Sequence, residues 1–282
     1  MIKGLFVFKK TVIFIGSIIL ISSCTTVSFE DKAELGKVAL ADGLIREAID
    51  HYSEALLLKP DDNQSKIGLG LALFKAGAYE DCISNLKNAF LENNYEALFV
   101  LGESYRIQGD YKKALLYHKR AFVADTTQYK SLRSIAWIYL KLRNYSLAEL
   151  NAYKATKIGY NDDETFIVLI RVLLEIGKFK AAQEVLSQRK WHSKHIPILL
   201  TLKGQLYLSL NKYKSAEKYF RKALSLYPFL VTALSGLSRC LEQNGQTAEV
   251  KTLQERARRL GYSLDSDHQS KSTYEILDAQ GY

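Results

Sequence analysis

Two histidines, His192 and His195, have the spacing closest to that of a metal-binding pair in this chain of 282 residues. Imidazole nitrogens are common Zn²⁺ ligands, but a zinc site needs at least a third protein ligand. No such ligand lies at a helical spacing from the pair, and Pro197 follows closely, where it can open a helix without the loss of a hydrogen bond. We therefore interpret the pair as part of a solvated turn and expect no metal site and no cofactor.

The sequence also lacks the short motifs that mark common catalytic sites. It contains no glycine-rich phosphate loop, no nucleophile elbow and no HExxH zinc motif. Cys82 and Cys240 fall where the repeat described below requires a small or buried residue, so we interpret them as packed thiols. We expect no catalytic residues and no enzymatic activity. An enzyme with an activity that these motifs do not reveal is the alternative from another functional class.

The third cysteine, Cys24, ends a segment with the layout of a secretory signal. Residues 1–23 contain three lysines and no acid, and their apolar run from Thr11 to Ile21 is too short to span a bilayer. The stretch Ile-Ser-Ser-Cys that ends at Cys24 resembles the lipobox of bacterial lipoproteins. The resemblance implies cleavage before Cys24, attachment of diacylglycerol to its thiol and acylation of the new amino terminus. An ordinary signal peptide or N-terminal anchor is the alternative.

These features predict where the protein resides. We expect a lipoprotein signal peptide at residues 1–23 and a lipidated tether at residues 24–28, which together place the chain in the bacterial cell envelope. Thr25, rather than an aspartate, follows the cysteine. By resemblance to enterobacterial sorting, this favours the outer membrane, with the protein facing the periplasm and held by its N-terminal lipid.

The formal net charge of +9 suggests a nucleic-acid partner at first sight. Removal of residues 1–23 takes away three lysines and no acid, so 36 basic and 30 acidic residues remain, a net charge of +6. The remaining bases alternate with acids, and an exported chain has no routine access to cytoplasmic nucleic acid. We therefore expect no nucleic-acid partner.

A repeated pattern dominates the rest of the chain. Its small residue recurs in steps of 34 residues, with one step of 32, and an apolar residue recurs thirteen positions upstream of it. A glycine marks a helix break between the two columns in most repeats. The small column consists of Ala48, Cys82, Ala114, Ala148, Ala182, Ala216 and Val250. The apolar column consists of Leu35, Leu69, Leu101, Ile135, Leu169 and Leu237, with Lys203 as its one break.

This pattern resembles the tetratricopeptide repeat (TPR), including the closing proline of that family at Pro60 and Pro228. The resemblance covers residues 29–264 and implies about seven helix-turn-helix repeats. The expected fold class is therefore all-α: a TPR α-solenoid whose stacked repeats form a right-handed superhelix. We expect residues 265–282 to form a C-terminal capping segment.

A stacked helical solenoid offers the concave face lined by the first helix of each pair as its binding surface. Aromatic side chains there supply contact area, and arginines bind carboxylates or backbone carbonyls, so the face suits an extended peptide or an amphipathic helix. Charged helix surfaces are common, however, and packing of Trp137 against the neighbouring repeat is the alternative. The peptide-binding candidates are Phe99, Glu103, Arg106, Lys130, Arg133, Trp137 and Arg171.

The sequence thus predicts a lipid-anchored scaffold or adaptor that binds proteins or peptides in the cell envelope. Outer-membrane TPR lipoproteins of similar architecture include factors for pilus assembly and for secretion, so assistance in such assembly is the first expectation. An adaptor that recruits peptidoglycan hydrolases or proteases is the alternative. The oligomeric state stays open.

Overall fold

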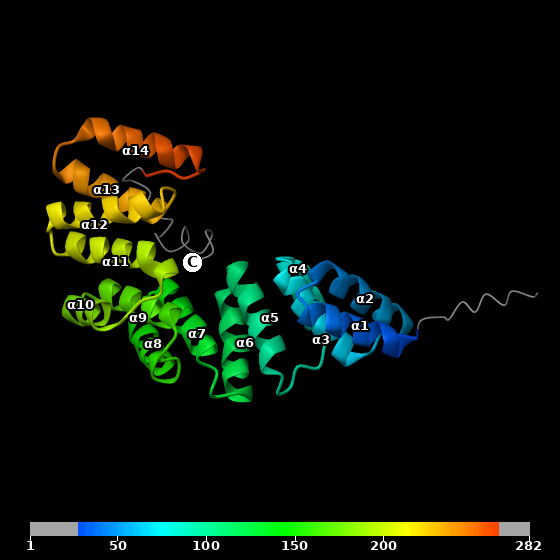
Figure 1. Ribbon diagram of the computed structural model, residues 1–282. Coiled ribbons are helices and arrows are strands. Elements are labelled where there is room, and N and C mark those ends of the chain that lie inside the picture. The colour runs from blue at the N-terminus through cyan, green and yellow to red at the C-terminus, as the bar shows by residue number, and fades with distance from the viewer. Residues whose placement is uncertain (1–27, 265–282) are drawn as a thin grey trace, which may run out of the picture.

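The computed structural model describes residues 28–264, and all regular secondary structure in this part of the chain is helical (Figure 1). It forms 14 α-helices and one short 3-10 helix, with no strand among the described residues. The first helices of the pairs are α1 (Phe29–Ala41), α3 (Asn63–Lys75), α5 (Tyr95–Ile107), α7 (Tyr129–Lys141), α9 (Asp163–Glu175), α11 (Ile196–Ser209) and α13 (Val231–Gln243). The second helices are α2 (Ile45–Leu58), α4 (Tyr79–Leu86), α6 (Tyr111–Ala124), α8 (Tyr145–Ile158), α10 (Phe179–Gln188), α12 (Tyr213–Leu226) and α14 (Thr247–Arg259).

Seven consecutive helical pairs stack side by side, as the repeat pattern predicts. Each helix packs against the next one, and each first helix also packs against the first helix of the following pair. The first helices therefore form a continuous layer of their own. Figure 1 shows the pairs succeeding one another along an arc from α1 to α14. The expected all-α solenoid of seven repeats is confirmed.

In every pair, the turn after the first helix contains a residue with a left-handed backbone conformation. Five of these turns use a glycine, with φ between 73° and 81°, as at Gly109. In the fourth and sixth pairs the position is taken by Arg143 (φ 56°) and Asn211 (φ 57°). The amide of Asn144 donates to the carbonyl of Tyr139 at 2.8 Å, which is the bond that closes a Schellman motif. The turn geometry is thus conserved through the solenoid even where glycine is absent.

Large side chains from second helices fill the seams between first helices. A Cβ atom added to Gly204 or Gly236 would lie 2.6 Å or 2.3 Å from the ring of Phe220. Glycine is therefore needed on both sides of this ring because any side chain would displace it. The predicted small column is buried next to these seams, with Ala114, Ala148 and Ala216 completely covered. The repeat period therefore places large side chains of the second helices against small residues of the first helices.

Two second helices are short, and the chain after each is fastened to the start of the same pair. Helix α4 ends at Leu86, where the single step of 32 residues occurs, and Asn63 exchanges two hydrogen bonds with the backbone of Phe90. Helix α10 ends at Gln188, and Asp163 binds the segment that follows it. Asn63 and Asp163 are the first residues of α3 and α9. In both pairs, therefore, the first residue of the first helix binds the chain that follows the short second helix.

Cys24, the proposed signal peptide and the proposed capping segment at 265–282 lie outside the described residues. Among the helices between residues 28 and 264, none combines the length and the apolarity that crossing a bilayer requires.

Candidate functional site

A cavity of about 1000 Å³ lies along the layer of first helices, from the third pair to the sixth. Four of these helices contribute side chains in succession, so the cavity crosses the pairs rather than lying within one of them. The residues that bound it from these helices and from the segment before α11 are Glu103, Arg106, Ile107, Arg133, Ser134, Trp137, Glu164, Ile167, Val168, Arg171, Lys194, His195 and Ile198. Tyr79 and Tyr111 add two aromatic rings at the starts of α4 and α6.

Five of the seven candidate binding residues line this cavity: Glu103, Arg106, Arg133, Trp137 and Arg171. The structure does not bring Phe99 or Lys130 to it. The ring of Phe99 extends to the second helix of its own pair, where it lies 5.4 Å from the ring of His118. Lys130 is exposed in the first turn of α7 and does not line the cavity. Helical spacing identified the face on which five of the candidates line the cavity, but not how far each side chain reaches along it.

Glu103 is the centre of a buried polar cluster in the cavity wall. Its Oε2 accepts a hydrogen bond from Nε of Arg106 at 2.8 Å, and its Oε1 accepts one from the hydroxyl of Ser134 at 2.5 Å. Nε2 of His118 lies 3.2 Å from the same Oε1. Burial alone would raise the pKa of Glu103, but Arg106, His118 and Ser134 together hold that pKa well below its ordinary value. Glu103 is therefore ionised, and both of its carboxylate oxygens contact neighbouring side chains.

The residue types of a hydrolytic triad meet in this cluster, but their order does not produce a nucleophile. In a triad the histidine lies between the serine and the acid and accepts the hydroxyl proton. Here the hydroxyl of Ser134 donates directly to Oε1 of Glu103, and Nε2 of His118 lies 3.2 Å from that same oxygen. The cluster therefore organises the cavity wall and does not activate Ser134.

Trp137 lines the cavity but is only 7% exposed. The ring of Tyr111 meets it edge-on at 5.9 Å, and the guanidinium of Arg106 lies 4.8 Å from its centroid. Tyr111 and Arg106 belong to the third pair and Trp137 to the fourth, so Trp137 packs against the neighbouring repeat. Nζ of Lys141 also lies 4.8 Å from the centroid of the Trp137 ring, so little of the ring is left for a ligand to contact.

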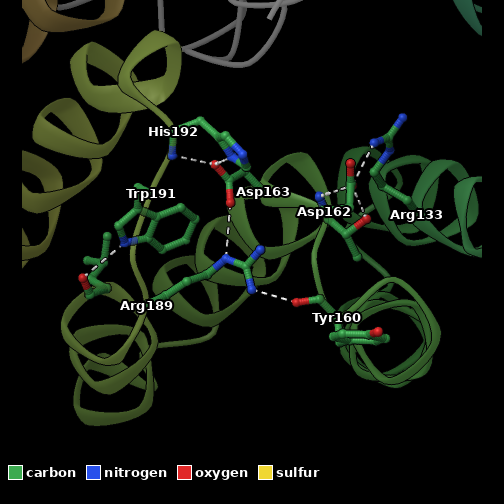
Figure 2. Close-up of polar contacts among 9 residues, drawn as sticks. Arg133, Tyr160, Asp162, Asp163, Arg189, Trp191 and His192 are labelled. Carbon is green, nitrogen blue, oxygen red and sulfur yellow. Dashed lines mark hydrogen bonds and ion pairs between the residues drawn. The ribbon is translucent and has the colours of Figure 1, made fainter.

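Arg133 is fastened to the start of the next first helix, as Figure 2 shows. Its Nη1 lies 3.0 Å from Oδ2 of Asp162 and 2.7 Å from Oε2 of Glu164. Asp162 also caps α9 by accepting the amide of Thr165 at 2.8 Å. Its two partners therefore fix Arg133 at the cavity edge.

Sequence reasoning missed the contribution of Lys194 and His195 to the cavity. We expected a solvated turn around the histidine pair, and this is correct for His192, whose side chain is 70% exposed, but wrong for His195, which is buried in the cavity wall. The two histidines have different surroundings, and residues 28–264 contain no group of three His, Cys, Asp or Glu side chains that could hold a metal ion. No repeat of this segment exists elsewhere in the chain, so no pattern could reveal its role.

The cavity wall carries more positive than negative charge. Arg106, Arg133, Arg171 and Lys194 face two carboxylates, Glu103 and Glu164. Burial, with Lys194 beside it, lowers the pKa of His195 below its ordinary value, so its imidazole is neutral at neutral pH. Together with the rings of Tyr79 and Tyr111, this charge suits a ligand that has both apolar and anionic groups.

Family models described as tetratricopeptide repeat match residues 34–81 and 197–230 of the chain. BBSome complex member BBS4 of Bos taurus is 25% identical over 194 residues, which cover 68% of this chain and 37% of the relative. Signal recognition particle subunit SRP72 of Dictyostelium discoideum is 26% identical over 205 residues, which cover 72% of this chain and 30% of the relative. The chain thus spans about a third of the length of these curated relatives.

Solved structures match more of the chain than the family models do. A tetratricopeptide repeat protein from Parabacteroides merdae has a TM-score of 0.70 at 15% identity and covers 90% of this chain and 99% of that protein. PilF of Pseudomonas aeruginosa has a TM-score of 0.56 at 17% identity, and the match covers 71% of this chain and 92% of the PilF chain. YrrB has a TM-score of 0.52 at 19% identity, and the match covers 65% of this chain and 95% of YrrB. The chain therefore contains tetratricopeptide repeats and folds as a solenoid of that type.

Proposed function

We propose that this protein is a lipid-anchored scaffold of the bacterial cell envelope that binds a protein or peptide in the cavity on its first helices. The observation that carries the proposal is the cavity itself, which crosses four helical pairs and is lined by the rings of Tyr79 and Tyr111 and by an excess of basic side chains. TPR solenoids serve as interaction scaffolds in general, and the solved structure of YrrB is described as a TPR protein with an unusual peptide-binding site.

The location in the proposal rests on the sequence around Cys24. A lipid at this residue would leave only residues 25–28 between the membrane and the first helix, so the solenoid would be held close to the bilayer. Assistance in the assembly of a pilus or secretion system belongs to the same proposal. The similar fold of PilF is compatible with it, and its low identity makes the likeness one of fold alone.

The binding part of the proposal can be tested by photocrosslinking in intact bacteria. A photoreactive amino acid replaces Ile107, which lines the cavity and is 44% exposed, and in a matched control replaces Leu150, which is 48% exposed on α8 and does not line it. We expect a specific adduct from position 107 that the control lacks, with the partner identified by mass spectrometry. Equal adducts from both positions, or none, would contradict the proposal.

The anchor is tested separately with Cys24→Ala. We expect this variant to lose metabolic labelling by a radioactive fatty acid and to leave the membrane fraction. Retention of both properties would show that Cys24 is not the lipid attachment site.

A further inference from the structure

The chain between α10 and α11 leaves the regular path of the repeat. Helix α10 has 10 residues, whereas α8 and α12 have 14, yet the 34-residue spacing of the small column is kept across it. Residues 189–195, called the linker below, therefore lie outside both α-helices. They include the short 3-10 helix η1 (Ser193–His195), which brings the end of the linker to the cavity.

Asp163 binds the linker with both of its carboxylate oxygens, as Figure 2 shows. Oδ1 accepts a hydrogen bond from Nε of Arg189 at 3.0 Å. Oδ2 accepts the backbone amide of His192 at 2.9 Å and lies 2.7 Å from its Nδ1. The Asp163 side chain is only 2% exposed, so these three contacts replace the water that the carboxylate gives up on folding.

Arg189 adds further contacts that fix the start of the linker. Its Nη1 donates to the carbonyl of Tyr160 at 2.5 Å, and its guanidinium lies 4.3 Å from the centroid of the Phe166 ring. The indole of Trp191 donates to the carbonyl of Leu186 at 3.3 Å. The linker is therefore held at several points on α9 and α10 before it reaches the cavity.

The linker places two residues at the cavity, Lys194 and His195. Lys194 is exposed, lines the cavity and forms no ion pair with any residue between 28 and 264. His195 follows it in the wall. Arg106 and Arg133, in contrast, lie in contact with Glu103 and Asp162. The charge that is best placed to meet a ligand is thus at the linker end of the cavity.

We propose that the linker is a specificity element, positioned by Asp163, which uses Lys194 to select peptides that carry a carboxylate at this end of the cavity. The inference rests on the proposed function, since it assumes that the cavity holds a peptide. Charge complementarity identifies the ligand as an acidic peptide, and the rings of Tyr79 and Tyr111 in the cavity lining offer contact to its apolar side chains.

The test uses two fluorescein-labelled peptides, one of alternating glutamate and leucine and one in which glutamine replaces every glutamate. Binding to the full chain is measured by fluorescence anisotropy at low salt. We expect the glutamate peptide to bind about tenfold more tightly than the glutamine peptide. Lys194→Glu should abolish this preference, whereas Lys190→Glu should keep it, because Lys190 is an exposed lysine of the same linker that does not line the cavity.

The positioning role of Asp163 is tested by the ratio of the two affinities, which a general loss of folding would not change selectively. We expect Asp163→Asn to reduce the preference for the glutamate peptide while the glutamine peptide binds as before. In the Asp163→Asn background, Lys194→Glu should add little, because Lys194 is no longer held at the cavity. Circular dichroism checks that all variants retain their helical content.

Equal affinity for the two peptides, or equal losses from Lys194→Glu and Lys190→Glu, would overturn the inference. It would also fail if neither peptide bound, or if Asp163→Asn kept the full preference. The proposed function is judged independently by the crosslink from position 107, so it can stand when the inference fails.

Discussion

Two seams of the solenoid are built at equivalent positions but with opposite chemistry. In the sixth pair, the ring of Phe220 lies between Gly204 and Gly236, and it is completely buried. In the third pair, His118 takes the place of the phenylalanine and lies against Gly102, with Ser134 where the other seam has Gly236. Glu103 completes this second seam by contacting His118 and Ser134. One seam is apolar and the other is a charged network.

The difference shows where the repeat serves packing and where it serves a site. The apolar seam requires only a large ring and two glycines, and its stabilisation comes from the burial of that ring. The polar seam must offset the desolvation of a carboxylate, and it does so with Arg106, His118 and Ser134. In return, Glu103 and Ser134 form part of the cavity wall. A departure from the repeat at a buried position therefore marks the candidate site.

The largest effect is expected from a truncation of the apolar seam. Phe220→Ala should lower the free energy of unfolding by about 3–5 kcal/mol, because it leaves a cavity between two glycines that cannot fill it. Chemical denaturation followed by circular dichroism measures this loss. Phe229→Ala is the matched control, since Phe229 is 53% exposed and its truncation should cost far less. Equal losses would show that burial does not distinguish the two rings.

A smaller effect is expected in the polar seam. Glu103→Gln should lower the free energy of unfolding at pH 7 by about 2 kcal/mol, because it leaves Arg106 and His118 without their carboxylate. The same denaturation experiment measures it. A neutral or stabilising effect would mean that the desolvation of Glu103 outweighs its contacts.

The pH dependence of this effect tests its electrostatic origin. The pKa of Glu103 is lower in the folded chain than its ordinary value of 4.5, so its contribution to stability is fully present above that value. The contribution is lost as the pH falls through the folded pKa, where the carboxylate gains its proton. The stability difference between the wild type and Glu103→Gln should therefore shrink as the solution is acidified below pH 4.5. A difference that does not change with pH would contradict the assignment of an ionised Glu103.

The smallest effect is expected from Ser134→Ala. This change removes one hydrogen bond to Glu103 and should cost about 1 kcal/mol at pH 7. The double variant with Glu103→Gln provides the control, because the loss should be smaller once the acceptor is already neutral. Strict additivity of the two losses would show that the hydroxyl and the carboxylate do not act together.

The fold could be predicted from the sequence because its determinants recur. The small column, the glycine breaks and their period of 34 residues specify paired helices, and residues such as Ala148 and Ala216 are buried as the pattern requires. Arg143 shows that the turn forms without glycine, since the hydrogen bond from the amide of Asn144 to the carbonyl of Tyr139 closes it around the left-handed residue. Periodicity therefore predicted the architecture even where one member of the pattern was missing.

The candidate site was only partly predictable, for a related reason. Helical spacing identified the face on which Glu103, Arg171 and three other candidates line the cavity, but it could not show that Phe99 reaches toward His118. Lys194 and His195 belong to a segment that occurs once, and their position depends on contacts made by Asp163, 29 residues before His192. Long-range contacts of this kind leave no signal in a periodic pattern.

The continuous layer of first helices also bears on how the molecule comes apart. In a stack where each pair packs on its neighbours, local unfolding starts most easily at an end and spreads inward as a moving boundary. Two pairs precede the helices that form most of the cavity, and one follows them, so fraying at either end can proceed before the cavity is lost. A peptide bound across the cavity would contact four pairs at once, and local unfolding from either end would then stop at those pairs.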